Sequence, residues 1–235
     1  KMAVDKKHWY KNPNTTWNYR RKMSKWHFDT TLDDTNYEGI KMNFVRFKGD
    51  WSNELDRSQF KESPPMDLSE YLVRMAIQEM IELGIDYKCE GKRMTVDPIK
   101  HPKIQKIVDS FQLRSPYAQV LLQKPGDFFQ YHIDAICYDG LDRHKVTDMS
   151  EVEIDNESVR MFVAMEDWSW GQYLLMGNYH WTQWKAGDCM WFRWQDMPHG
   201  SANCGHIDRP MLKITGKKTP EFEKLLSETD RIIEV

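Results

Sequence analysis

One short stretch of the sequence places a histidine and an aspartate two positions apart in an otherwise aromatic and aliphatic run. His132 and Asp134 lie in KPGDFFQYHIDAICYDG, residues 124–140. If this run is a β-strand, residues i and i+2 point to the same face, so the imidazole and the carboxylate lie side by side. A half-buried strand with a hydrogen-bonded His and Asp fits the same spacing. A divalent metal site therefore requires a third ligand further along the chain.

The third ligand is sought among the histidines of the strand-rich second half, His180, His199 and His206. His199 follows an aromatic strand predicted over residues 190–194, and Arg209 comes ten residues after it. Two imidazoles and one carboxylate on one face of a metal leave open positions opposite, which is typical of non-haem Fe(II) oxygen chemistry. An arginine presents a planar fork that binds a carboxylate bidentately, so Arg209 is a candidate to bind a carboxylate near such a metal.

This order of residues resembles the Fe(II)/2-oxoglutarate-dependent dioxygenases. Their pattern of H-x-D, a distal His, and an Arg or Lys about ten residues later is matched by His132, Asp134, His199 and Arg209. The resemblance covers residues 115–219 and is closest to the prolyl and the aspartyl/asparaginyl hydroxylase branches. It implies that the first three residues bind Fe(II) and that Arg209 binds the distal carboxylate of 2-oxoglutarate. The implied reaction uses O₂ to hydroxylate a C–H bond, with release of succinate and CO₂.

Further polar residues are candidates to support this site. Gln119 and Gln123 alternate with apolar residues in the strand before the Pro-Gly turn, and Lys213 and Thr215 share one face of a later strand if that strand is regular. Similar positions often bind a carboxylate in the superfamily that the chain resembles, although a solvated strand face explains the pattern equally well. Asn203 and Ser201, near His199, are candidates to hydrogen-bond the distal histidine and fix its tautomer.

The elements that must position these residues are mainly strands. From residue 115 onward, short apolar segments alternate regularly with turn residues, which predicts a β-sandwich or barrel. The resemblance implies a double-stranded β-helix, a jelly-roll or cupin-like core. Apolar residues at helical spacing with Pro at the start predict helices over residues 64–84, 101–113 and 220–235. The expected fold class is therefore mainly β with flanking helices.

The expected organisation is a single domain spanning residues 1–235. Residues 1–112 would form a basic and aromatic arm with supporting helices, residues 113–219 the double-stranded β-helix catalytic core, and residues 220–235 a C-terminal helix. The acidic segment 138–158 has few apolar residues and is predicted to be a surface loop that could cover the mouth of the barrel.

Composition favours a cytoplasmic protein. No apolar run approaches the roughly 20 residues that span a bilayer, and no signal peptide is visible. We therefore expect no membrane partner. The cysteines form no C-x-x-C pair, which fits a reducing compartment and buried Cys acting as a small apolar residue. They are Cys89, Cys137, Cys189 and Cys204.

Two other classes of function stay open on the sequence. A metal-binding, cupin-like hydrolase could use the same three ligands, but it gains nothing from Arg209. A non-catalytic module for nucleic acid or protein could use the basic, aromatic residues 1–27, which equally fit an arm packed on the core. For an oxygenase, the order of preference for the prime substrate is a protein or peptide side chain, then a small amino-acid-like molecule, then a nucleic-acid base.

Overall fold

The computed structural model describes residues 40–62, 91–132, 157–177, 179–192 and 199–235, with the backbone alone at residues 130–132. Several features predicted from the sequence lie outside these residues. They are the arm of residues 1–27, the helix over 64–84, Asp134, and all but the end of the loop 138–158.

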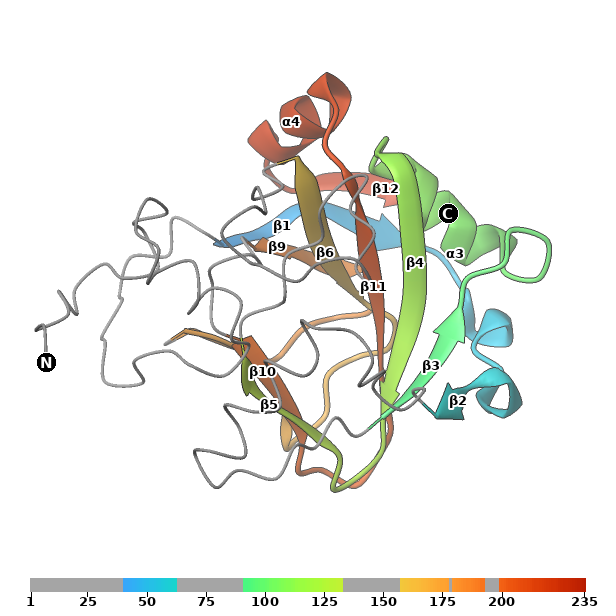
Figure 1. The fold of residues 1–235 in the computed structure, drawn as a ribbon, viewed down its shortest axis with the longest axis vertical. Coiled ribbons are helices and arrows are strands. Elements are labelled where there is room, and N and C mark those ends of the chain that lie inside the picture. The colour runs from blue at the N-terminus through green and yellow to red at the C-terminus, as the bar shows by residue number, and fades with distance from the viewer. Residues whose placement is uncertain (1–39, 63–90, 133–156, 178, 193–198) are drawn as a thin grey trace, which may run out of the picture.

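Strands form two sheets that face each other (Figure 1). The larger sheet has the order β12-β1-β9-β6-β11-β4-β3-β2, and the smaller sheet has the order β5-β10-β7-β8. The strands of the larger sheet are β1 (Ile40–Lys48), β2 (Lys61–Glu62), β3 (Lys92–Thr95), β4 (Arg114–Gln123), β6 (Ser158–Ala164), β9 (Asp188–Phe192), β11 (Arg209–Lys217) and β12 (Arg231–Glu234). Those of the smaller sheet are β5 (Phe128–His132), β7 (Gln172–Met176), β8 (Tyr179–Trp181) and β10 (His199–Asn203).

The path of the chain from β4 to β11 is that of a jelly roll. The chain passes back and forth between the two sheets, so that β4, β6, β9 and β11 join the larger sheet and β5, β7, β8 and β10 form the smaller one. Two facing antiparallel sheets of four strands each, linked in this way, make a double-stranded β-helix. The predicted fold class, mainly β with flanking helices around such a core, is confirmed.

Side-chain alternation along the strands divides the core in two. On β11, Leu212 and Ile214 lie on the outer face of the larger sheet, in a cluster that also contains Phe111 beside α3 (Pro102–Ser110) and Phe222 of α4 (Pro220–Ser227). Met211 belongs to a second cluster between the sheets, and so do the buried tryptophans Trp181 and Trp184. The inner cluster is the one that surrounds the site described below.

The helix predicted over residues 101–113 is confirmed as α3, which begins at a proline after His101 and buries Ile104 and Ile107. The helix predicted over residues 220–235 is shorter than expected. It ends at Ser227, and residues 231–234 form β12, which pairs in parallel with β1. Residues 40–112 also supply three strands: a strand followed by a turn is predicted from NFVRFKGDW, residues 43–51, and corresponds to β1, whereas β2 and β3 were not predicted.

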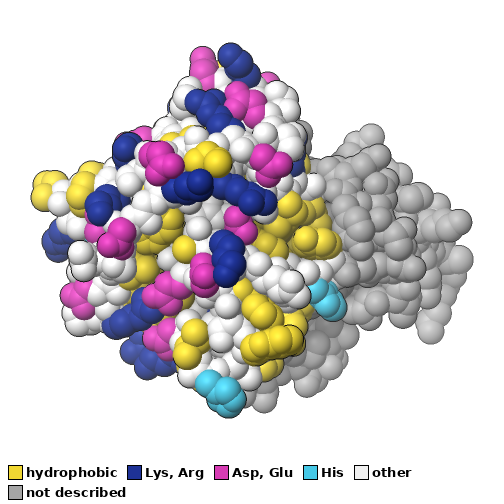
Figure 2. Space-filling model, turned by 180° about the vertical axis from the view of Figure 1, so that it is seen from behind, with side chains coloured by type: hydrophobic (Ala, Val, Ile, Leu, Met, Phe, Trp, Pro, Cys, Tyr) yellow, Lys and Arg dark blue, Asp and Glu magenta, His cyan; other side chains and the backbone are white. Residues whose placement is uncertain are grey.

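The surface seen from behind carries mixed charge. Figure 2 shows Lys and Arg side chains interspersed with Asp and Glu side chains over the described part of this face.

Two short 3-10 turns, η2 (Ser52–Glu54) and η3 (Arg57–Gln59), lie between β1 and β2. No helix within the described ranges is long and apolar enough to cross a membrane.

Candidate functional site

A cavity of about 100 Å³ lies between the two sheets. Its walls come from both sheets: Leu121 and Met211 belong to the larger sheet, and Leu174 to the smaller one. Among the residues that the structure describes, five basic side chains and no acidic one line this cavity. Four residues predicted to act in the site are among the lining residues, namely Gln123, His199, Arg209 and Lys213.

Arg209 forms a buried cationic end of the cavity. It opens β11 opposite Gln123 of β4, and its side chain is only 4% exposed. Its Nη2 donates to Oε1 of Gln123, and its Nη1 donates to the carbonyl oxygen of Tyr173 at 3.3 Å. No described residue accepts a hydrogen bond from Nε. Since a guanidinium carries five N–H groups, donors remain for a ligand.

The guanidinium of Arg209 is shielded from solvent. Burial lowers its pKa to about 10, because the cation loses its hydration. This value still leaves the guanidinium charged at neutral pH. A buried cation without a carboxylate beside it is costly, and a bound anion would offset that cost.

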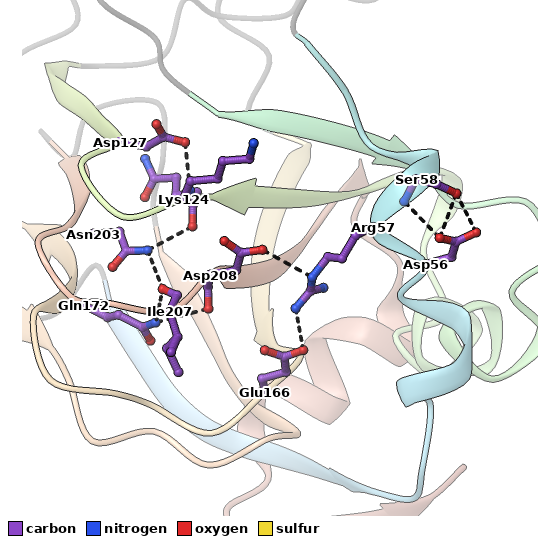
Figure 3. Close-up of polar contacts among 11 residues, drawn as sticks. Asp56, Arg57, Ser58, Lys124, Asp127, Glu166, Gln172, Asn203, Ile207 and Asp208 are labelled. Carbon is purple, nitrogen blue, oxygen red and sulfur yellow. Dashed lines mark hydrogen bonds and ion pairs between the residues drawn. The ribbon is translucent and has the colours of Figure 1, made fainter.

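Asn203 fixes the turn that leads into β11 (Figure 3). This residue ends β10 and is fully buried. Its Nδ2 donates to the carbonyl oxygen of Gln123 at 2.9 Å and to that of Ile207 at 2.8 Å, and its Oδ1 accepts from the backbone N–H of Gly205 at 3.1 Å. Asn203 thus holds the turn before Arg209, and not the ring of the distal histidine as the sequence suggested.

A second buried amide supports the same turn from the smaller sheet. Gln172 is 1% exposed, and its Nε2 donates to the carbonyl oxygens of Ile207 and Asp208 at 3.4 and 3.3 Å. At the surface, the carboxylate of Asp208 lies 3.4 Å from Nε of Arg57, which also pairs with Glu166 at 2.7 Å (Figure 3). Gln172 was not predicted from the sequence. Its only signal was a polar residue at the start of an apolar strand.

His199 opens β10 and is 6% exposed. Its ring meets the ring of Phe192 edge-on, with 4.8 Å between centroids, and Phe192 in turn stacks on Phe162. The backbone places His199 directly opposite His132 in the antiparallel pair of β10 and β5. Directly opposed residues have Cα atoms about 4.5–5.5 Å apart. The two predicted histidines are thus brought together by the strand register.

The complete predicted metal triad extends beyond the described residues, because Asp134 and the side chain of His132 lie outside them. Within the described ranges, no group of three His, Cys, Asp or Glu side chains could hold a metal ion. The other two histidines considered as third ligands, His180 and His206, are both exposed.

The remaining predicted residues lie at different depths. Gln123 and Lys213 line the cavity, whereas Gln119 and Thr215 line an adjoining groove on the inner face of the larger sheet. Lys213 and Gln119 are register partners, so Gln119 sits beside the site without lining the cavity itself. Of the two glutamines, only Gln123 contacts Arg209.

Two arginines that the sequence analysis did not single out also line the cavity. Arg160 is a charged residue within the apolar strand β6, and Arg93 lies on β3. In VRMFVAM, residues 159–165, Arg160 takes an inward position of an otherwise apolar strand. A charged residue at such a position is unusual, and this was the signal available in the sequence.

Comparisons with known proteins find only distant structural similarity. No protein-family model matches the chain, and no curated protein does. A prolyl-4-hydroxylase from Pseudomonas putida matches with a TM-score of 0.42 and 16% identity, over 72% of this chain and 98% of that chain. A cupin 2 conserved barrel domain protein from Salinispora arenicola matches with a TM-score of 0.32 and 10% identity, over 70% of this chain and 95% of that one. A predicted oxalate decarboxylase from Thermotoga maritima matches with a TM-score of 0.33 and 11% identity, over 56% and 84%. These similarities are too distant to indicate an activity.

Proposed function

We propose that this protein is an Fe(II)- and 2-oxoglutarate-dependent oxygenase that hydroxylates a C–H bond of its prime substrate. The metal ligands would be His132, Asp134 and His199, and Arg209 would bind the distal carboxylate of 2-oxoglutarate. The observation that carries the proposal is the environment of Arg209, a buried cation with N–H donors to spare in a cavity that it shares with His199.

The donor types fit the two groups. Imidazole and carboxylate ligands with open positions suit non-haem Fe(II), and the opposed positions of His132 and His199 suit two ligands of one ion. At the other end, Gln123 and the carbonyl of Tyr173 orient the guanidinium of Arg209. A carboxylate bound there would replace lost hydration with charge-assisted hydrogen bonds.

The residues of the cavity would each have a role in the proposed reaction. When bound, iron would supply the O₂-dependent oxidation that converts 2-oxoglutarate to succinate and CO₂ and places one oxygen atom on the substrate. Arg209 positions the keto acid, and the apolar walls formed by Phe162, Leu174 and Met211 exclude water from it. The residues Gln119, Gln123, Lys213 and Thr215 are proposed to assist, with Gln123 acting through Arg209.

The proposal is tested by replacing Arg209, the residue assigned to the distal carboxylate of 2-oxoglutarate. Arg209→Ala should raise the KM for 2-oxoglutarate by about a hundredfold, since two charge-assisted hydrogen bonds contribute roughly 3 kcal/mol. Succinate formation in the presence of Fe(II) and O₂ is the readout. Arg209→Lys should recover part of the loss, because the charge is kept and the bidentate fork is lost.

Arg114→Ala is the matched control, because Arg114 is an exposed arginine on β4 whose partner is Glu157 at 2.9 Å. Its KM should be unchanged. If the Arg209→Ala protein turns over a hydrolysable substrate like wild type and wild type forms no succinate, the hydrolase is the correct function and the proposal is wrong.

A further inference from the structure

The guanidinium of Arg209 is held between the two sheets. Its Nη2 donates to Oε1 of Gln123 on β4, in the larger sheet, and its Nη1 donates to the carbonyl oxygen of Tyr173 on β7, in the smaller sheet, at 3.3 Å. An arginine side chain has several rotatable bonds, so its direction is set by the groups that accept from its N–H donors. The direction of Arg209 therefore depends on where β7 lies relative to the start of β11.

Gln172, the residue before Tyr173, contacts the backbone that leads into Arg209. It is 1% exposed, and its Nε2 donates to the carbonyl oxygens of Ile207 and Asp208 at 3.4 and 3.3 Å (Figure 3). These two residues immediately precede Arg209 in the chain. One buried amide therefore ties the start of β7 to the start of β11.

These contacts form a closed ring. From Gln172, one hydrogen bond reaches the carbonyl oxygen of Asp208, whose neighbour in the chain is Arg209. The guanidinium of Arg209 then reaches back to Tyr173, whose neighbour is Gln172. Both the base and the tip of the Arg209 side chain are thus fixed relative to Gln172. Asn203 differs, because its side chain ties the turn before β11 to the end of β4.

The amide of Gln172 fits its surroundings in one orientation. Its Oε1 accepts from the backbone N–H of Ser169 at 3.2 Å, so its Nε2 faces the two carbonyl oxygens. A flipped amide would place its oxygen against those carbonyl oxygens and its NH₂ group against an N–H. Because buried polar groups without partners are costly, the three contacts keep this side chain in place.

The turn before β7 holds Gln172 from the other side. Nε1 of Trp168 donates to the carbonyl oxygen of Gln172 at 2.8 Å. This turn lies against the turn before β11, because the N–H of Cys204 donates to the carbonyl oxygen of Gly171 at 2.8 Å. A Cβ on Gly171 would come within 2.6 Å of the backbone nitrogen of Gly205. A shift of one turn therefore moves the other.

We propose that Gln172 is a positioning residue for Arg209, which sets the direction of the guanidinium and thereby the affinity for the distal carboxylate of 2-oxoglutarate. Gln172 is not among the residues that line the cavity, so it acts through Arg209. The effect on 2-oxoglutarate rests on the proposed function, whereas the effect on the guanidinium does not. A carboxylate pairs with an arginine through two parallel hydrogen bonds, and a change in direction weakens both.

The test replaces Gln172 by methionine, which has a similar length and no amide. Gln172→Met should raise the KM for 2-oxoglutarate about tenfold, the effect of one weakened hydrogen bond. Its kcat should stay within about twofold of wild type, because the change affects binding of the keto acid in the ground state and the transition state alike. Binding of Mn(II) in the absence of 2-oxoglutarate should be unchanged, because His199 is not part of the ring of contacts.

Two controls separate this effect from lost stability. Gln105→Met is the chemically matched control, because Gln105 lies in α3 and its Nε2 donates to Oδ1 of Asp109 at 2.7 Å. Leu225→Ala is the control for stability, because it removes a buried side chain from the outer core. Both should keep the wild-type KM. An equal rise in KM in Gln172→Met and Leu225→Ala would overturn the proposal.

The direction of the guanidinium is measured without iron or 2-oxoglutarate, by NMR of isotope-labelled arginine side chains. Nε of Arg209 is buried and has no acceptor among the described residues, so its N–H signal should exchange slowly with water. The signal is assigned by its loss in Arg209→Lys. In Gln172→Met it should shift and exchange about tenfold faster, because the ring of contacts opens more often. In Gln105→Met and Leu225→Ala it should match wild type.

A second variant keeps the proposal testable if Gln172→Met does not fold, as judged by circular dichroism. Trp168→Phe keeps an aromatic ring, removes the donor to the carbonyl oxygen of Gln172, and should change the Arg209 signal in the same direction. A wild-type signal or a wild-type KM in the variant that folds would overturn the positioning role. If wild type binds no 2-oxoglutarate and forms no succinate, the proposed function is wrong, and the NMR comparison alone decides the role of Gln172.

Discussion

At the scale of single residues, burial decides which side chains can act. Arg209 is buried and Arg160 is half-buried, and loss of hydration lowers the pKa of both guanidinium groups. Burial has a different consequence at Cys189, because it keeps the thiol uncharged and unreactive. Cys189 lies on β9, fully buried in the outer core, and its Sγ donates to the carbonyl oxygen of Val45 on β1 at 2.9 Å. It packs as a small apolar residue, as the sequence predicted for a scattered cysteine.

Cys189 therefore yields a prediction about reactivity. Burial raises the pKa of its thiol from 9.0 to about 12, so the thiolate fraction at pH 8 should be about a thousandfold lower than for an ordinary thiol. A disulfide reagent should label the exposed Cys204 in the native protein and spare Cys189, as peptide mapping by mass spectrometry would show.

The same shift predicts how stability depends on pH. Because the folded pKa of Cys189 is raised, its contribution is fully present below pH 9 and is lost as the pH rises toward 12. When urea unfolds the protein, the disulfide reagent should label Cys189 and Cys204 alike. Equal labelling of Cys189 and Cys204 in the native protein would contradict the burial of Cys189 on β9.

At the scale of elements, turns place the functional strands. Gly187 has φ +88° in the turn before β9, its N–H donates to the carbonyl oxygen of Ala164, and its own carbonyl accepts from Phe47. A Cβ at this position would overlap the carbonyl oxygen of Phe47. Gly126, in the turn between β4 and β5, has φ +93° but open space around it.

These two glycines form a matched pair for mutation. Gly126→Ala should cost only the positive φ, about 1–2 kcal/mol. Gly187→Ala should cost at least about 3 kcal/mol of unfolding free energy, because overpacking adds to the same backbone cost. Urea denaturation measures both, and equal losses in the two variants would show that the contact between Gly187 and Phe47 is not close.

The turn before β11 allows the positioning of Arg209 to be tested separately from the stability of the fold. Asn203→Ala would remove the side-chain donor to the carbonyl oxygen of Gln123 and would leave the carbonyl oxygen of Ile207 with only the 3.4 Å contact from Gln172, at a cost of roughly 2–4 kcal/mol. It should also raise the KM for 2-oxoglutarate, because the turn before Arg209 loses its side-chain tie to the end of β4.

The control for this variant is Leu225→Ala in α4, a buried residue in the outer core. It should lose a similar unfolding free energy, about 2–5 kcal/mol, and keep the wild-type KM. A normal KM in Asn203→Ala would mean that Asn203 stabilises the fold without positioning Arg209.

The elements that could be predicted from the sequence are those with a local signal. The helix α3 shows Pro at its start and apolar residues at helical spacing, and the core strands alternate between turns. The strand β12 could not be predicted, because Ile232 and Ile233 adopt it by pairing with β1 at the other end of the described chain. Arg160 was missed for a similar reason, since its place in the cavity depends on which strands lie beside β6.

At the scale of the whole molecule, the site exists because the jelly roll brings distant residues together. His132 and His199 meet through the register of β5 and β10, and Arg209 meets Gln123 through that of β11 and β4. The H-x-D, His and Arg pattern could be predicted from spacing, whereas the places of Arg93 and Arg160 in the cavity could not. The central claim is that one cavity holds both a metal and a keto acid.

The most direct test is an anaerobic titration of the apo protein with Fe(II) and then 2-oxoglutarate, following the weak visible charge-transfer band of the chelated keto acid. The account predicts that the band forms in wild type, is absent in His199→Ala, and needs a far higher concentration of 2-oxoglutarate in Arg209→Ala. Metal binding without the band in wild type would contradict it, because the His-Asp-His site would then serve another chemistry.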